Sequence, residues 1–359
     1  SDRTLSGTIY RVAPKGFKPV VPKLNLNTQT GQIAALRSPA INTRYLGFSR
    51  LKEAGEESIV PLVQLAKDSN PYVAARAIWI LAQLGGTAER ALSMLLEAEF
   101  KGGGTPQTRI VAFRAFRRAN HPGMMDLARR LAGDPSPAVR REVAFYLRNE
   151  EANPSVVSIL VELAKRYDGK DRTYLEAFGT GATGKEAAVY AALVKDTKSS
   201  DWNKATAGAV WRLMTAAAIP ALQERVFNRK LPVADRSQAL ESIAFVRSGS
   251  AANAMVDVAN LTQEKELADR AAFWEKWNND RWWKSYKPAD KLKGGNTKQK
   301  LVSVVIPEEQ GPSKLPSVAE ILKLKGDATR GKAVAGRCIS CHVIGDLGLD
   351  VGPNLTGFG

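Results

Sequence analysis

The stretch Asp134-Pro135-Ser136-Pro137-Ala138-Val139-Arg140 decides the fold of this chain, because it joins two prolines to the start of an apolar helical pattern. Proline is tolerated in the first turn of a helix, where its missing N–H would have no partner in any case. Further along, Val139, Val143 and Leu147 recur at a spacing that puts them on one helix face. The stretch therefore predicts a helix that begins near Pro137 and buries one side.

The same arrangement recurs upstream at a nearly constant interval. Four prolines are separated by 32, 35 and 31 residues, and each precedes a similar apolar pattern: Pro39, Pro71, Pro106 and Pro137. The second residue after each proline is Ile41, Val73, Thr108 or Val139, and the sixth is Tyr45, Ala77, Ala112 or Val143. In the last three units the tenth residue is Leu81, Phe116 or Leu147. Because one helix face recurs at a period of roughly 20 to 50 residues, the sequence predicts a repeat architecture.

A second amphipathic helix follows each of these helices, with apolar residues at i, i+3 and i+4. The clearest second helices are residues 58–67, 89–100, 123–131 and 155–167. Looser helix pairs begin near Asp171, Asp201 and Pro232, with second helices at 185–195, 218–228 and 251–261. Two-helix units of this length, with a proline-containing boundary at residues 134–140, resemble HEAT repeats. The resemblance implies an all-α chain in which about seven or eight units stack into an α-solenoid.

A glycine-rich stretch at residues 179–185, Gly-Thr-Gly-Ala-Thr-Gly-Lys, satisfies G-x-G-x-x-G and most of a phosphate-binding P-loop. Phosphate binding in this manner requires a strand before the loop, but residues 173–178 have a helical pattern. Glu186 also stands where the Mg²⁺-binding Ser or Thr would be, and its charge would repel phosphate. We interpret the stretch as a turn between two helices.

Aromatic residues concentrate towards the end of the last helical unit: Phe273, Trp274, Trp277, Trp282, Trp283 and Tyr286. Trp274 and Trp277 are spaced i, i+3 and therefore share a helix face. Stacked repeats need a cap over their final apolar face, and we expect these side chains to form it. The alternative is base stacking by an aromatic and basic segment, but no nucleic-acid motif accompanies it.

Both cysteines of the chain lie in the pentapeptide Cys338-Ile339-Ser340-Cys341-His342, which has the C-x-x-C-H order of c-type haem attachment. In that chemistry two thiols form thioethers with the haem vinyl groups, and the histidine is an axial iron ligand. A redox dithiol, a disulfide and half of a zinc site are the alternatives, but the chain has no second C-x-x-C. The sequence therefore predicts haem c bound covalently through Cys338 and Cys341, with His342 as the metal ligand.

Residues on both sides of this motif resemble the class I cytochrome c domain. They are Gly331-Lys332-Ala333-Val334-Ala335-Gly336-Arg337 before it and Gly352-Pro353-Asn354-Leu355-Thr356 after it. The resemblance implies a short helix before the motif and a loop on the proximal side of the haem. In that loop the Pro353 carbonyl would accept a hydrogen bond from His342. The sequence departs from the family where Val334 or Ala335 replaces the usual aromatic residue.

The chain also departs from that family at the sixth iron ligand. The family usually supplies a methionine after the motif as this ligand. All five methionines of this chain precede it, and the 17 residues after His342 contain no Met, His, Lys or Cys. We expect the native chain to extend beyond Gly359, and a five-coordinate iron or a borrowed ligand are the alternatives. His121 lies in the turn-like sequence Asn120-His121-Pro122-Gly123 and is not expected to be that ligand.

The chain is strongly basic, with 52 Lys and Arg against 36 Asp and Glu among 359 residues and a net charge of +16. Such a surface can attract nucleic acid, anionic membrane or an acidic protein. The basic residues are spread along the helices without a nucleic-acid motif, so we predict an acidic redox partner protein, or simply a solvated surface, and no nucleic acid. No run approaches the ~18 apolar residues of a membrane span. Because c-type haem is attached outside the bacterial cytoplasm, we expect a periplasmic or otherwise extracytoplasmic location.

The domain order follows from these patterns. Residues 1–30 are an extended segment, in which residues 5–12 have a strand-like alternation before a run of prolines and Gly16. A lone strand cannot bury its own face, so we expect it to close a sheet upstream of Ser1 or to pair with another chain. Helical repeats then span residues 31–280, a basic linker 281–314, and the N-terminal part of a cytochrome c-like haem domain 315–359.

This order resembles the large haem-binding, HEAT-containing membrane-bound dehydrogenases of planctomycete and verrucomicrobial type bacteria. Residues 6–14 look like the end of their N-terminal propeller, and residues 36–44 look like the opening of their helical repeat. In that family the propeller is similar to quinoprotein sugar dehydrogenases. The resemblance therefore implies two partners for this chain, a propeller and the end of the haem domain, on missing segments or on other chains.

We therefore predict electron transfer through haem c carried on a HEAT-repeat scaffold, within a larger extracytoplasmic dehydrogenase. The alternative is an interaction solenoid in an extracytoplasmic assembly whose haem is not catalytic. The sequence shows no substrate pocket with a general base, so it leaves open whether this chain is itself an enzyme.

Overall fold

The computed structural model describes residues 12–18, 23–101, 105–279, 281–292, 317–323, 325–336, 338–339, 342–344, 347–348 and 355. By its internal contacts the chain divides into two compact units, Ser1–Lys293 and Gly294–Gly359. The described part is all-α apart from one two-stranded ladder. None of the described helices has the length and hydrophobicity that a membrane span requires.

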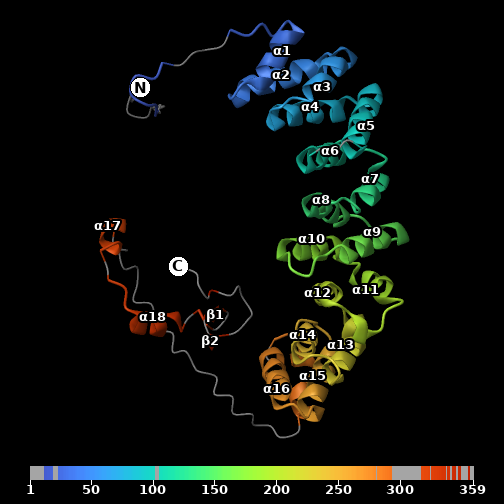
Figure 1. Cartoon of the computed structure of the whole chain (residues 1–359), viewed down its shortest axis with the longest axis vertical. Helices are drawn as coiled ribbons and strands as arrows, with labels where there is room; N and C mark the ends of the chain where they lie inside the picture. The colour runs from blue at the N-terminus through green and yellow to red at the C-terminus, as the bar shows by residue number, and fades with distance from the viewer. Residues whose placement is uncertain are drawn as a thin grey trace, which may run out of the picture. The chain divides into compact units, whose positions relative to one another are not determined.

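The first unit is a series of helix pairs preceded by α1 (Gln29–Arg37) (Figure 1). The first helices of the pairs are α2 (Ile41–Glu53), α4 (Pro71–Leu84), α6 (Pro106–Arg118), α8 (Pro137–Leu147), α10 (Arg172–Ala182), α12 (Lys204–Leu213), α14 (Val233–Ala244) and α16 (Lys265–Asn279). The second helices are α3 (Ile59–Leu65), α5 (Gly86–Lys101), α7 (Met124–Leu131), α9 (Pro154–Lys165), α11 (Glu186–Val194), α13 (Ile219–Phe227) and α15 (Gly249–Leu261). Short 3₁₀ segments complete the unit: η2 (Gly55–Ser58), η3 (Ser199–Asp201), η4 (Ala216–Ala218), η5 (Lys284–Tyr286) and η6 (Pro288–Lys291).

Successive pairs stack on one another. The first helices pack side by side from α2 to α16, and from α4 onward each also packs on at least one second helix. In Figure 1 the helices α4, α6, α8 and α10 form one column, and α5, α7, α9 and α11 lie along its other side. Contacts between neighbouring units are the mark of a solenoid, so the predicted all-α, HEAT-like architecture is confirmed.

Local signals in the sequence determine where the helices begin. Pro71, Pro106 and Pro137 occupy the first turns of α4, α6 and α8, as predicted. The residue before several helices accepts a hydrogen bond from a first-turn N–H through its side chain: Asn70, Thr105, Asn153, Asp171 and Asn203. Each such cap stabilises a helix by roughly 0.5–2 kcal/mol, so the unit boundaries are encoded locally.

One cluster of buried hydrophobic side chains extends through the pairs. The predicted apolar face is confirmed in the units that begin at Pro71 and Pro137, where Val73 and Val139 are buried. It is wrong for the first unit, because Ile41 and Tyr45 of α2 are exposed. That helix instead directs Gly47 onto α1, where a side chain at this position would collide with the backbone.

The aromatic cap predicted for the last unit is present. Trp274 and Trp283 are fully buried in the core cluster, and the Trp283 ring N–H donates to the Val246 carbonyl at 3.0 Å. Trp277 and Trp282 pack against the same cluster, whereas Tyr286 is exposed. The first twelve residues of the predicted linker, 281–292, include η5 and η6, and η6 packs on α15 and α16.

In the second unit the described elements are α17 (Val318–Ile321), α18 (Ala328–Ala335), β1 (Val343–Ile344) and β2 (Leu347–Gly348). The two strands pair in antiparallel fashion, with Val343 opposite Gly348 and Ile344 opposite Leu347. Most of the strand predicted at residues 5–12 lies outside the described residues.

Candidate functional site

The C-x-x-C-H motif begins three residues after the last residue of α18. The Cys338 N–H donates to the Ala335 carbonyl at 2.8 Å, and the His342 N–H donates to the Cys338 carbonyl at 2.9 Å. Cys338 is a free cysteine with an exposed side chain. Cys341 and Pro353 lie outside the described residues.

The described surroundings of this motif do not fit a haem. Cofactor sites are concave and mostly apolar, so a porphyrin ring requires buried side chains against its faces. No residue of α18 is buried and Val334 is exposed, while Ile339 and Leu355 are only half-buried. Nowhere in the described part do three or more His, Cys, Asp or Glu side chains gather as metal ligands. The prediction of covalently bound haem c as a cofactor is therefore wrong, because the motif spacing specifies the attachment chemistry but not the enclosing site.

The binding roles predicted for Cys338, Cys341, His342 and Pro353 stay predictions. His121 lies in the predicted inter-helix turn, where its Nδ1 accepts a hydrogen bond from the Gly123 N–H at 2.8 Å and its ring packs edge-on to Phe116. It lines a hollow of about 250 Å³ together with Lys52 and Gln83, whose side chains hydrogen-bond to each other.

The glycine-rich stretch at residues 179–185 joins two helices as predicted, but it is helical up to Ala182, so only residues 183–185 form the turn before α11. Gly181 allows α10 to approach α8 closely, since a Cβ there would lie 2.5 Å from the Ala144 carbonyl oxygen. Lys185 is buried, and its ammonium group donates to the Thr183 carbonyl at 3.0 Å. Burial, together with the nearby Arg148 charge, lowers the pKa of Lys185. These contacts connect helices and leave no phosphate cradle.

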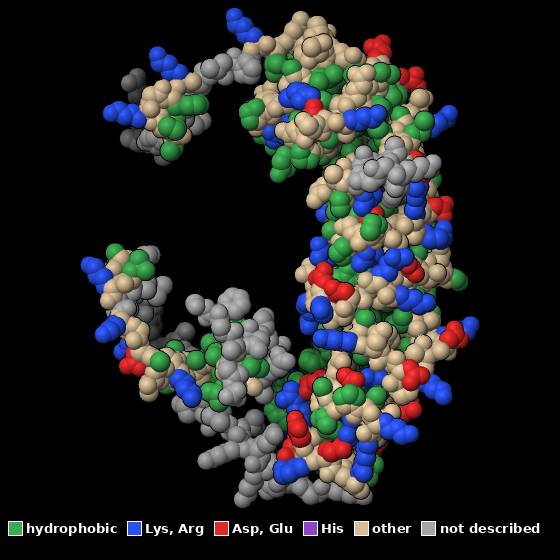
Figure 2. Space-filling model, viewed as in Figure 1, with side chains coloured by type: hydrophobic (Ala, Val, Ile, Leu, Met, Phe, Trp, Pro, Cys, Tyr) green, Lys and Arg blue, Asp and Glu red, His purple; other side chains and the backbone are tan. Residues whose placement is uncertain are grey.

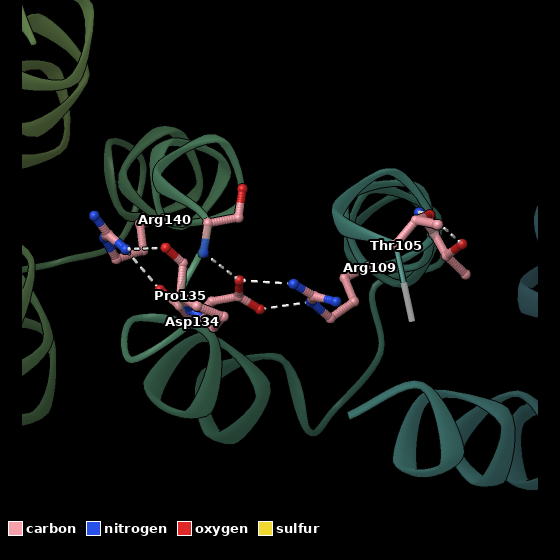
Figure 3. A network of polar contacts seen from close by, with 7 residues as sticks. Thr105, Arg109, Asp134, Pro135 and Arg140 are labelled. Carbon is pink, nitrogen blue, oxygen red and sulfur yellow. Dashed lines mark hydrogen bonds and ion pairs between the residues drawn. The ribbon is translucent and has the colours of Figure 1, made fainter. Parts of the chain in front are cut away.

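Buried charge joins one helix pair to the next (Figure 3). Arg109 of α6 donates from Nε and one terminal nitrogen to the two carboxylate oxygens of Asp134, at 2.6 and 2.9 Å. Asp134 also accepts from the Ser136 N–H at 2.8 Å, just before α8 begins. Arg140 donates to the carbonyls of Asp134 and Pro135 at 2.6 and 3.1 Å. The stretch that predicted the fold is therefore also the point where two units are locked together.

A second charged group lies on α10 and α12. Glu176 accepts hydrogen bonds from Arg172 at 2.6 Å and from Arg212 at 2.7 Å. Burial alone would raise the pKa of Glu176, but the hydrogen bonds and charges of Arg212 and Arg172 outweigh it and hold the pKa below its usual value. Arg212 lies over Gly179 and lines a hollow of about 360 Å³ with Glu186 and other residues.

A continuous chain of aromatic rings crosses the ends of α12, α14 and α16. Neighbouring ring centroids lie 5.3 to 6.3 Å apart, in the order Trp211, Phe245, Trp274, Phe273 and Trp277. Three guanidinium carbons lie over these rings: that of Arg172 is 4.7 Å from the Trp211 centroid, that of Arg270 5.8 Å from Phe273, and that of Arg281 3.5 Å from Trp277. We name these eight residues the arginine–aromatic stripe.

The surface of the helical array is basic. Lys and Arg side chains are spread over the face that Figure 2 shows, interspersed with fewer Asp and Glu. Several exposed arginines of the array, among them Arg118, Arg148 and Arg281, have no carboxylate partner within the described residues. Unpaired surface arginines of this kind are available to an external anion.

No protein-family model matches the chain, and no curated protein matches its sequence. Among solved structures it is similar to human deoxyhypusine hydroxylase in complex with glycerol, at 16% sequence identity and a TM-score of 0.28. The match covers 70% of this chain and 97% of that one.

Proposed function

We propose that this chain is an interaction scaffold: a HEAT-like solenoid that binds a partner protein within a larger assembly. The electron transfer predicted from the sequence required the haem and is not part of the proposal. The extracytoplasmic location predicted on the same ground stays a prediction.

The observation that carries the proposal is the contrast between the interior and the surface of the array. Inside, buried charges such as Arg109 and Asp134 pair with each other across a unit boundary. Outside, arginines such as Arg118 and Arg281 have no carboxylate partner among the described residues, on a chain with a net charge of +16. A rigid repeat surface with excess positive charge favours association with an acidic protein and speeds their encounter.

Cross-linking in the producing cells tests this function. A carbodiimide joins lysine amines to carboxylates that are already in contact, and mass spectrometry of the recovered chain identifies the linked peptides. We expect cross-links from residues 23–292 to acidic peptides of one other protein, and we expect them to disappear when cells are lysed in high salt before coupling. Recovery of the chain with internal cross-links alone would overturn the proposal.

A further inference from the structure

We propose that the arginine–aromatic stripe binds an acidic, extended peptide segment of the partner protein, an inference that rests on the scaffold function proposed above. The stripe was defined by its ring and guanidinium contacts, and it extends from α10, which carries Arg172, to the end of α16.

The arginines of the stripe lie over aromatic rings, which restrict the motion of their guanidinium groups. Arg172 and Arg270 already donate from Nε to Glu176 and Glu241, so a new carboxylate would bind their terminal nitrogens. Arg281 lies 3.5 Å above the Trp277 centroid, and its one described hydrogen bond goes to the Trp277 carbonyl. Arg172 lies over Trp211 at the other end of the stripe. Because the rings hold these side chains in place, little conformational entropy is lost when a carboxylate binds.

The charge of the stripe also points to an acidic ligand. Among the described residues two carboxylates contact it, and each is already paired: Glu176 with Arg172 and Arg212, and Glu241 with Arg270 at 2.5 Å. Arg281 has no carboxylate partner among the described residues, and Lys276 nearby on α16 is exposed. The stripe therefore carries excess positive charge that a partner's Asp and Glu side chains would neutralise.

The spacing of the helices sets the length of the segment. Packed helices lie about 8–10 Å apart, so the three steps from α10 to α16 cover roughly 25–30 Å. An extended chain rises about 3.3 Å per residue, and a segment of about eight residues therefore spans the stripe. The half-buried rings of Trp211, Phe245 and Trp277 would supply apolar contact between the charged ends.

The same geometry disfavours single-stranded nucleic acid as the ligand. Bases bind such proteins by stacking on open aromatic faces. Here Arg281 covers one face of Trp277 and Arg172 covers one face of Trp211, while the rings pack on their neighbours. A peptide carboxylate needs the guanidinium edge and not the ring face, so the arrangement favours a peptide.

The test measures binding of the full chain to a fluorescent peptide of about twelve residues rich in Glu and Asp, long enough to exceed the stripe. Its matched control is the same peptide with Gln and Asn. The test variant is Arg172→Gln/Arg281→Gln, and the matched protein control is Arg118→Gln/Arg148→Gln, which removes the same charge from exposed positions away from the stripe. Circular dichroism verifies that both variants are folded.

We expect the acidic peptide to bind and the amide peptide not to bind. The stripe variant should bind about tenfold more weakly, which corresponds to about 1.4 kcal/mol, and the control variant should change by less than about threefold. Equal weakening in both variants would overturn the stripe as the site while leaving the scaffold proposal intact. The inference also fails if the wild type ignores the acidic peptide, or if an oligothymidylate displaces it and depends on the same two arginines. Cross-linking in cells judges the scaffold function separately in each case.

Discussion

Replacing Asp134 by alanine should destabilise the helical array more than any other single loss of a carboxylate that we identify. Asp134 and Arg109 are only 4% and 6% exposed, and the carboxylate receives two hydrogen bonds from Arg109 and one from the Ser136 N–H. Asp134→Ala removes all three and strips a buried guanidinium of its carboxylate. Breaking a buried pair in this way costs about 3–5 kcal/mol.

Urea denaturation followed by far-ultraviolet circular dichroism measures this loss as a fall in the free energy of unfolding. The matched control is Asp126→Ala, which breaks the exposed Arg129–Asp126 pair at 2.6 Å and should cost at most about 1 kcal/mol. The double variant Arg109→Met/Asp134→Ala removes both charges, so it should be more stable than Asp134→Ala alone.

The reasoning about stranded charge would be refuted by either of two results. One is a cost for Asp134→Ala no larger than that for Asp126→Ala. The other is a double variant whose loss equals the sum of the losses measured for Arg109→Met and Asp134→Ala separately, because independent effects add and a coupled pair does not.

Three further predictions follow from other contacts. Gly181→Ala should destabilise the array by roughly 1–3 kcal/mol, since the added Cβ meets the rigid Ala144 carbonyl, whereas Gly179→Ala on the same helix meets the flexible Arg212 side chain and should cost less than about 1 kcal/mol in the same urea titration. Because the pKa of Glu176 is lowered from 4.5 in the folded state, its contribution to the free energy of unfolding is present above pH 4.5 and is lost as pH falls through the lower folded value. The free energy of unfolding, measured from pH 6 to pH 3, should therefore fall less steeply in Glu176→Gln than in the wild type. An unchanged slope would contradict this. Burial and then the Glu150 charge raise the pKa of Tyr146 to about 12. In an alkaline ultraviolet titration, Tyr146→Phe should therefore remove one phenol that ionises late and leave the number of phenols that ionise near pH 10 unchanged.

The helix pairs could be predicted because their signals are local. Pro71, Pro106 and Pro137 mark helix starts that need no distant contact, and the apolar period identifies buried residues such as Val139. The same rule fails at Ile41 and Tyr45, because which face of α2 is buried depends on α1 and the next unit and not on its own period.

The arginine–aromatic stripe could not be predicted from local sequence signals. Arg172 and Trp211 lie far apart in the sequence, and nothing in either neighbourhood indicates that one stacks on the other. The aromatic run at residues 273–286 was recognised as a cap, but its arginines were not recognised as part of a surface. The spacing of Cys338, Cys341 and His342 predicted a cofactor that their described surroundings do not fit. A linear motif specifies the reactive groups but not the side chains that would enclose the cofactor.

The nearest-neighbour stacking of the pairs bears on how the array forms. Ion pairs between neighbouring units, such as Arg109 with Asp134 and Glu241 with Arg270, join residues only 25 and 29 positions apart. Low separation of this kind lets assembly start at any adjacent two pairs and spread in both directions, without waiting for the chain ends to meet. The first few pairs would therefore fold and stack while the rest of the chain is still being synthesised. The cap around Trp283 would pack last onto the array.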